Sequence, residues 1–161
     1  MKTIFPTYTG LDFAMTTNVD VSGSCNAFYG GGSINFYAQG NDCNSMAEIG
    51  DVVYHEYGHG INDYRYGNSG MWNGALGEGY ADIWGLSITQ NPILGLGMSL
   101  TDPNDFVRRY DIDRKVYPQD LTGEVHADGE IIAGCWWDTY LGFNNMGQMM
   151  DLFKYTYDGA P

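Results

Sequence analysis

The apolar positions between residues 45 and 64 recur with the spacing of one face of an α-helix. These positions are Ile49, Val52, Val53 and Ile61. Ser45 and Glu48 stand in the S-x-x-E order of a capping box, in which two side chains satisfy free backbone N–H groups at the start of a helix. The pattern therefore predicts a helix that starts near Ser45 and covers about 47–64.

Two glycines interrupt this predicted helix. Gly58 and Gly60 each cost a helix about 1 kcal/mol relative to alanine, because glycine loses more backbone freedom on folding. Their presence in an otherwise regular pattern predicts that another element packs closely against the helix here.

The same helical spacing predicts three further helices, over about 75–90, 128–141 and 146–155. Asn91-Pro92 ends the first of these, because proline disfavours a helical residue before it. We expect this helix to bury Leu76, Tyr80, Ile83, Trp84 and Ile88. We expect the next one to bury Ile131, Ile132, Cys135, Trp136 and Tyr140.

The segment 8–40 has another pattern, with short alternating stretches among Gly, Ser, Thr and Asn, which is typical of strands and turns. Residues 25–29 and 33–37 flank Gly30-Gly31-Gly32, which predicts a hairpin with a tight turn. A phosphate-binding glycine loop is the alternative, but no Lys-Ser/Thr pair follows the glycines.

Residues 65–74 and 91–125 are rich in turn-forming residues and predict loops. The second loop is long for a small domain, and long loops often border a functional cleft. The elements together predict a single α+β domain over residues 1–161. Strands and a hairpin form its N-terminal part, and its C-terminal half is mostly helical.

Composition adds limits on partners. The chain has 161 residues, of which 43% are hydrophobic and 17% charged, as in a folded domain. Twenty acidic and 7 basic residues give a net charge of -13, so we expect neither nucleic acid nor an anionic membrane as a partner. No apolar run is long enough to span a membrane. Residues 1–6 lack the apolar region of a signal peptide, so we expect a fragment of a larger secreted precursor.

The three cysteines leave two arrangements open. Cys25 and Cys43 flank the predicted hairpin, so in a secreted protein they would form a disulfide and Cys135 would be a buried free thiol. The alternative is three unpaired, buried cysteines.

The segment His55-Glu56-Tyr57-Gly58-His59 carries the strongest chemical signal, since it holds two of the three histidines of the chain. Residues four apart lie one turn apart on the same face of a helix, so both imidazoles can reach one metal ion. Glu56 lies at the edge of that face, where a carboxylate can take a proton from a metal-activated water. The alternative, two unrelated histidines and a solvated charge, requires this pattern to arise by chance.

A catalytic zinc site needs a third protein ligand. Glu78 on the second predicted helix can supply it if that helix packs against the first. Asp82 lies one turn further on the same face, where it can accept a hydrogen bond from a ligand histidine and fix its tautomer.

These two segments, 55–59 and 77–82, resemble the signature of gluzincin metallopeptidases, namely the thermolysin-like and fungalysin-like zinc peptidases. The resemblance implies a zincin-like, zinc-dependent endopeptidase that acts on peptide or protein substrates. It implies that the zinc ligands are His55, His59 and Glu78, that Glu56 is the general base and that Asp82 orients a ligand histidine.

The resemblance extends to two further segments. Asn26-Ala27 resembles the edge strand that holds the substrate peptide in these enzymes, although an ordinary hairpin strand would look the same. His126 resembles the histidine that stabilises the oxyanion, whereas a lone histidine is by residue type more often structural. Asp120 is the nearest candidate to support it. Arg108 or Arg109 could hold a substrate carbonyl, but solvated surface charges are the simpler interpretation.

Two departures from the family pattern keep other functions open. No tyrosine falls at the spacing of the catalytic tyrosine, since Tyr64 and Tyr66 come too early and position 72 is Trp72. The chain is also shorter than a usual thermolysin-like catalytic region. A catalytically inactive, zinc-stabilised binding module is therefore the first alternative. The second is an acidic domain without zinc that binds calcium, for which the candidate ligands are Asp102, Asp105, Asp111 and Asp113.

Overall fold

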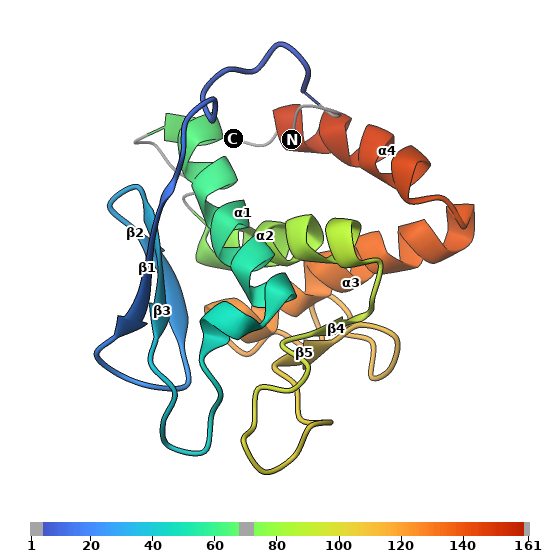
Figure 1. Ribbon diagram of the computed structural model, residues 1–161. Coiled ribbons are helices and arrows are strands. Elements are labelled where there is room, and N and C mark those ends of the chain that lie inside the picture. The colour runs from blue at the N-terminus through green and yellow to red at the C-terminus, as the bar shows by residue number, and fades with distance from the viewer. Residues whose placement is uncertain (1–4, 68–72, 160–161) are drawn as a thin grey trace.

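The computed structural model describes residues 5–67 and 73–159, so Trp72 and part of the predicted loop 65–74 lie outside the described residues. Helix α1 (Gly50–Tyr66) runs through the middle of the molecule, with a three-stranded sheet on one side and the other helices on the opposite side (Figure 1). Those helices are α2 (Gly74–Thr89), α3 (Val125–Phe143) and α4 (Met146–Gly159). The predicted α+β class, with N-terminal strands and a mostly helical C-terminal half, is confirmed.

The sheet has the order β1-β3-β2 and is built from Thr16–Val21 (β1), Ala27–Gly30 (β2) and Ser33–Tyr37 (β3). Strand β2 pairs antiparallel with β3, and Gly30 lies opposite Ser33. The turn is therefore the two residues Gly31 and Gly32, with φ values of 61° and 76° that suit glycine. The predicted hairpin is confirmed, and it leaves β2 with one free edge.

The start of α1 differs from the prediction. Residues Met46–Glu48 form a short 3-10 turn (η1), Ile49 is extended, and the α-helix begins only at Gly50. Ser45 makes no side-chain cap; its hydroxyl lies 3.4 Å from the carbonyl oxygen of Tyr37 at the end of β3. The predicted capping box is wrong, because the serine hydroxyl contacts the neighbouring strand instead of a helix terminus.

The glycines of α1 mark close packing, as predicted. A Cβ atom at Gly58 would lie 2.9 Å from the Cα atom of Ala81 in α2, and one at Gly60 would lie 2.6 Å from Met15 Cε. Only glycine permits such an approach of α1 and α2. The two helices therefore come close enough for side chains of both to share one site.

Two buried clusters flank α1. The larger cluster joins the helices and includes Tyr80, Ile83, Trp84, Trp136, Phe153 and Tyr157. The smaller cluster joins the sheet and η1 to α1 and includes Ile34, Phe36, Met46 and Val52. Helix α1 is thus fixed from both sides, which makes it a rigid base for the residues on its remaining face.

Two residues that were expected to be buried are exposed. Ile88 in the last turn of α2 is 57% exposed, and Cys135 is a free thiol on the exposed side of α3. Helix α3 instead buries Ala133, Trp136 and Trp137. The large apolar area of the two tryptophans determines which face of α3 turns inward, and Cys135 does not lie on that face.

Cys25 and Cys43 form a disulfide, which confirms the pairing predicted for a secreted protein. The bridge ties the start of β2 to the segment that leads into η1. A structural disulfide is compatible with an extracellular protein. Among the helices of the described residues, none combines the length and hydrophobicity that a membrane crossing requires.

The connection between α2 and α3 is mostly irregular, as predicted, apart from two short antiparallel strands, Ile93–Leu94 (β4) and Arg108–Arg109 (β5). The four aspartates considered for calcium lie in this region. Asp111 pairs with Arg109, Asp113 with Lys115, and Asp102 and Asp105 accept backbone hydrogen bonds. Within the described residues these aspartates do not form a group that could hold a metal ion, so the calcium alternative finds no support.

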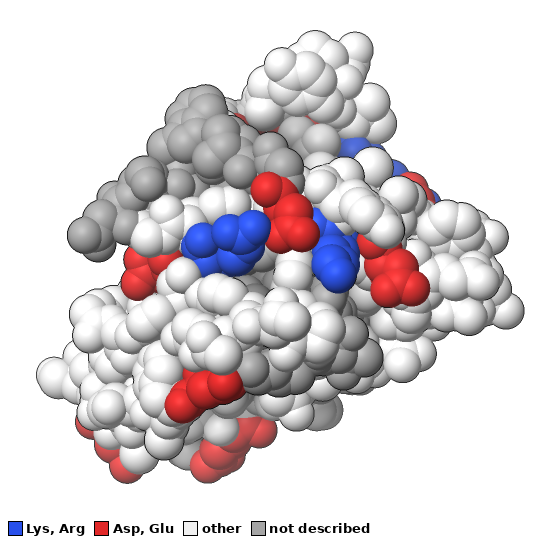
Figure 2. Space-filling model, turned by 90° about the horizontal axis from the view of Figure 1, so that it is seen from above, with Lys and Arg blue, Asp and Glu red and all other residues white. Residues whose placement is uncertain are grey.

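The few basic side chains of the chain are mostly paired with acidic ones. Arg65 of α1, for example, forms a 2.8 Å ion pair with Asp158 of α4. On the face seen in Figure 2, the basic side chains lie directly beside acidic ones. The acidic side chains outnumber these basic partners, so the net charge of the chain stays negative. That nucleic acid is not a partner of this protein stays a prediction.

Candidate metal centre

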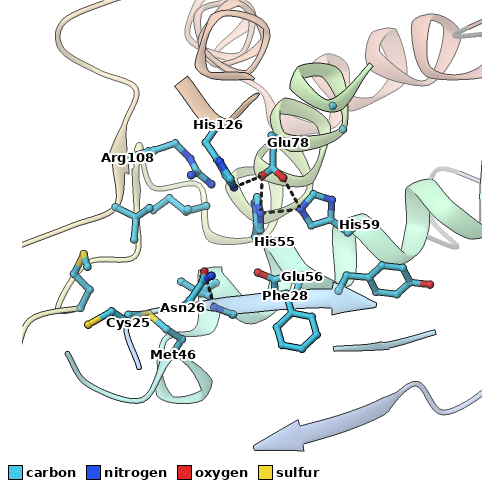
Figure 3. Close-up of a pocket in the computed structure, with 18 of the residues that line it drawn as sticks. Cys25, Asn26, Phe28, Met46, His55, Glu56, His59, Glu78, Arg108 and His126 are labelled. Atoms are coloured by element: carbon cyan, nitrogen blue, oxygen red, sulfur yellow. Dashed lines mark hydrogen bonds and ion pairs between the residues drawn. The ribbon is translucent and has the colours of Figure 1, made fainter. Parts of the chain in front are cut away.

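His55 and His59 lie one turn apart on the face of α1 that neither buried cluster covers, as their spacing predicted. Their ring centroids are 4.7 Å apart, and their Nε2 atoms are 3.1 Å apart. Both rings therefore present a nitrogen lone pair to the same small volume (Figure 3).

Glu78 of α2 completes this group. Its Oε2 atom lies 3.3 Å from His55 Nε2, and its Oε1 atom lies 3.4 Å from His59 Nε2. Ligand atoms of these three side chains all lie within 4.8 Å of one another. The predicted third ligand is thus brought to the two histidines by the close packing of α1 and α2.

The donor set fits a metal ion. Glu78 Oε2 is buried and has no hydrogen-bond partner among the described residues, although a buried carboxylate oxygen normally has one. A bound cation satisfies such an atom, and two imidazoles with one carboxylate are a common ligand set of catalytic zinc sites. His55, His59 and Glu78 can therefore hold a metal ion and leave further coordination positions open.

Asp82, also on α2, fixes the orientation of the His55 ring. Its Oδ1 atom lies 2.5 Å from Nδ1 of His55, and both side chains are buried. A hydrogen bond from Nδ1–H leaves the Nε2 lone pair free for a metal. The position predicted for Asp82, one turn beyond the third ligand, is the position that the structure shows.

Two neighbours of Asp82 make contacts that the sequence did not predict. Arg108 of β5 donates two hydrogen bonds to the carboxylate, at 2.7 and 2.8 Å, and is buried. The hydroxyl of Tyr110, which is 3% exposed, donates another. The prediction of a solvated Arg108 is wrong, whereas Arg109 is partly exposed and pairs with Asp111.

These contacts influence whether Asp82, His55 and Glu78 are ionised. Burial opposes an ionised Asp82, but the Arg108 guanidinium and His55 outweigh it and hold the pKa of Asp82 well below its usual range. Burial likewise opposes a charged His55, yet the Asp82 carboxylate raises the pKa of His55 to about 9. A metal that binds Nε2 of His55 therefore displaces a proton from it. Burial also opposes ionisation of Glu78, but the adjacent His55 and His59 rings lower its pKa far below the usual value.

Glu56 lies beside the three ligands without belonging to their group. It is 5% exposed and lines the same cavity. Burial raises the pKa of its carboxyl group above the usual value, although both neighbouring histidines act in the opposite direction. A carboxylate with a raised pKa is a better proton acceptor than a solvated one, which suits a general base.

His126, at the start of α3, reaches the opposite side of the metal group, with Nε2 3.6 Å from Glu78 Oε2 (Figure 3). It is not one of the three converging ligands, and its side chain is 53% exposed. Its Nδ1 atom lies 2.7 Å from Glu124 Oε1. Asp120, the candidate supporter, instead accepts a hydrogen bond from the backbone of Val116, so the supporting carboxylate is Glu124.

One cavity of about 860 Å³ lies between α1, β2 and the connection that carries β4 and β5, and it is lined by His55, Glu56, His59, Glu78, Arg108 and His126. Asn26 and Ala27 line it at the free edge of β2, and the Asn26 side chain accepts a 2.9 Å hydrogen bond from the Ala27 N–H. In Figure 3, Asn26 and Phe28 lie across the cavity from Glu78 and His126. One end of the cavity is apolar and is lined by Met46, Val52, Leu94, Met98, Phe106 and Val107.

Tyr110 and Glu124 were not predicted as partners, and Arg108 was considered only as a residue that holds a substrate carbonyl. Tyr110 and Arg108 come from the irregular connection, where charge and aromaticity suit the surface as well as the interior. Glu124 is the cap of α3, since its carboxylate also accepts a 2.8 Å hydrogen bond from the N–H of Ala127. An acidic residue two positions before His126 was a visible signal for Glu124.

Comparison with known proteins adds no further identification. No protein-family model matches the chain, and no curated protein matches it.

Proposed function

We propose that this protein is a zinc-dependent endopeptidase of the gluzincin type. The observation that carries the proposal is a buried Glu56 in the same cavity as the group His55, His59 and Glu78. A structural metal site has no need of a proton acceptor next to open coordination positions, whereas a hydrolytic site requires one. The resemblance to gluzincin peptidases agrees with this combination.

Zinc, when held by the three ligands, supplies a Lewis acid that lowers the pKa of a water molecule and polarises a carbonyl group. Glu56 accepts the proton of the attacking water, since its carboxylate lines the cavity beside the three ligands. The same carboxyl group then donates that proton to the leaving amine. Asp82 keeps the His55 ring in the tautomer that leaves Nε2 free throughout.

His126 stabilises the negative charge that develops on the substrate oxygen. Its Nδ1–H is directed at Glu124, so Nε2 carries a hydrogen only when the ring is protonated. The histidine lowers the pKa of Glu124 to about 2. The pair presents Nε2 of His126 to the cavity, where a protonated ring would donate to the substrate oxygen.

The substrate is a peptide that lies along the free edge of β2. An edge strand offers unpaired backbone groups to which an extended peptide can add as a further strand. Asn26 and Ala27 line the cavity at this edge. The apolar end of the cavity, with Met46, Leu94 and Phe106, accommodates an apolar substrate side chain. The disulfide and the negative charge fit action outside the cell.

The test is Glu56→Gln, because an amide can hydrogen-bond water but cannot accept its proton. We expect the variant to keep one zinc per chain by elemental analysis and to lose casein hydrolysis by at least about 100-fold. The matched control, Glu48→Gln, changes an exposed glutamate outside the cavity and should keep both zinc and activity. Inhibition of the parent protein by 1,10-phenanthroline checks that the activity depends on the metal.

Two results would contradict the proposal. If Glu56→Gln cleaves casein at the parental rate, Glu56 is not the base. If the parent protein binds zinc but cleaves no peptide, the site belongs to a zinc-stabilised binding module.

A further inference from the structure

The cavity continues past the metal group toward the C-terminal end of α1. Asp63 follows His59 by four residues, so it lies one turn further on the same face of the helix. It lines the cavity together with Tyr29 of β2. The Tyr29 hydroxyl donates a 2.7 Å hydrogen bond to Oδ2 of Asp63 and so fixes the carboxylate between helix and sheet.

This carboxylate is available to a cation. Asp63 is exposed and forms no ion pair with a described residue, while nearby Arg65 is paired with Asp158 at 2.8 Å. Asp63 also lies in the last turn of α1, where the helix dipole adds negative potential. Burial and the hydrogen bond to Asp63 raise the pKa of Tyr29, so the phenol stays protonated as a donor.

The position of Asp63 along the cavity determines which part of a bound peptide it would contact. Strand β2 runs from the Asn26 end, where Met46 and Cys25 lie in Figure 3, toward Tyr29 and Gly30. A peptide that adds antiparallel to the free edge of β2 has its N-terminal part near Tyr29. One helix turn rises about 5.4 Å, which an extended peptide covers in about two residues. Asp63 therefore faces a side chain that precedes the scissile bond.

We propose that Asp63, fixed by Tyr29, forms a subsite that selects peptides with a lysine or arginine on the N-terminal side of the scissile bond. This inference rests on the proposed peptidase function and names a substrate preference of the same site. The two ends of the cavity then differ, with an apolar subsite at one end and an acidic subsite at the other.

The experiment compares synthetic peptides that differ in a single residue. Each has leucine after the scissile bond and either lysine or norleucine at the first, second or third position before it. At one of these positions we expect the parent protein to have about fivefold higher kcat/KM for lysine, as an exposed ion pair allows. Asp63→Asn should remove the preference, and Asp63→Lys should favour glutamate at that position. The control Asp151→Asn removes an exposed charge on α4, outside the cavity, and should keep the preference.

A binding measurement separates this inference from the proposed reaction. The same peptides are titrated, by fluorescence anisotropy, onto the zinc-loaded Glu56→Gln variant with and without Asp63→Asn. Tighter binding of a lysine peptide that depends on Asp63 supports the subsite even if the parent protein cleaves nothing, in which case only the proposed reaction fails. Equal affinities and equal kcat/KM values for all lysine and norleucine pairs overturn the subsite and leave the reaction untouched.

Discussion

Two of the three histidines around Glu78, His55 and His126, lie in opposite environments. His55 is 5% exposed and fixed by Asp82, which is in turn bound by Arg108 and Tyr110; we call these four residues the buried side. The His126 side chain is 53% exposed, and its Nδ1 atom lies 2.7 Å from the exposed carboxylate of Glu124; we call these two residues the open side. The same residue type thus occurs in two settings, fixed in the interior and accessible at the cavity.

The difference follows from the cost of burying charge. A buried carboxylate is tolerated only when its partners compensate it, so each member of the buried side depends on the others. On the open side water provides most of the compensation, so a residue there can change without loss of the fold. Substitutions on the buried side should therefore act on stability and metal affinity, and those on the open side on reaction rate.

The largest expected effect on stability is that of Arg108→Met. It removes both hydrogen bonds from Arg108 to Asp82 and leaves a buried carboxylate undercompensated, which should lower the free energy of unfolding by about 3–5 kcal/mol. Urea titration followed by circular dichroism measures this. The neighbouring Arg109→Met breaks an exposed pair and should leave the unfolding midpoint unchanged. Equal effects of the two variants would show that burial of the Arg108–Asp82 pair does not increase its contribution to stability.

A smaller effect is expected for Tyr110→Phe. It removes one hydroxyl from the buried side and leaves Asp82 with one donor fewer, at a cost of about 1–3 kcal/mol in stability. Because Asp82 orients a metal ligand, zinc affinity should also fall by about tenfold, as competition with a chromophoric chelator can measure. Tyr117→Phe changes an exposed tyrosine and serves as control. A loss of stability with unchanged zinc affinity would show that Tyr110 supports packing alone.

The smallest effect on the fold is expected for His126→Gln. Its side chain is half exposed, so the free energy of unfolding should change by no more than about 0.5 kcal/mol and zinc affinity should stay the same. If His126 stabilises the oxyanion, kcat should fall by about 100-fold with little change in KM. A fall in zinc affinity comparable to that of His59→Ala would instead make His126 a fourth ligand and favour a closed, structural site.

Part of this arrangement was predictable because it depends on local periodicity. The four-residue spacing of His55 and His59 places both on one helix face in any context. Glu78 and Asp82 have the same spacing, so their shared face was also predictable. Gly58 and Gly60 indicated close packing, and the structure confirms it at Ala81 and Met15.

Other features depended on competition that a local pattern does not reveal. Ser45 and Glu48 match a capping box, but the Ser45 hydroxyl lies beside the end of β3 and the α-helix starts at Gly50. Cys135 has helical spacing with apolar neighbours, but two adjacent tryptophans determine the buried face of α3. In both cases a long-range contact outweighs a local preference.

The sequence by itself determined which side chains can bind a metal and which carboxylate can act beside them, because spacing along a helix does not depend on the rest of the fold. Only the tertiary structure decided what surrounds them. Arg108 and Tyr110 reach Asp82 because the connection after α2 folds back over that helix, and Asp63 meets Tyr29 because the sheet packs on α1. Such pairings join residues 26 to 34 positions apart, and burial, charge compensation and packing select them only once the chain is compact.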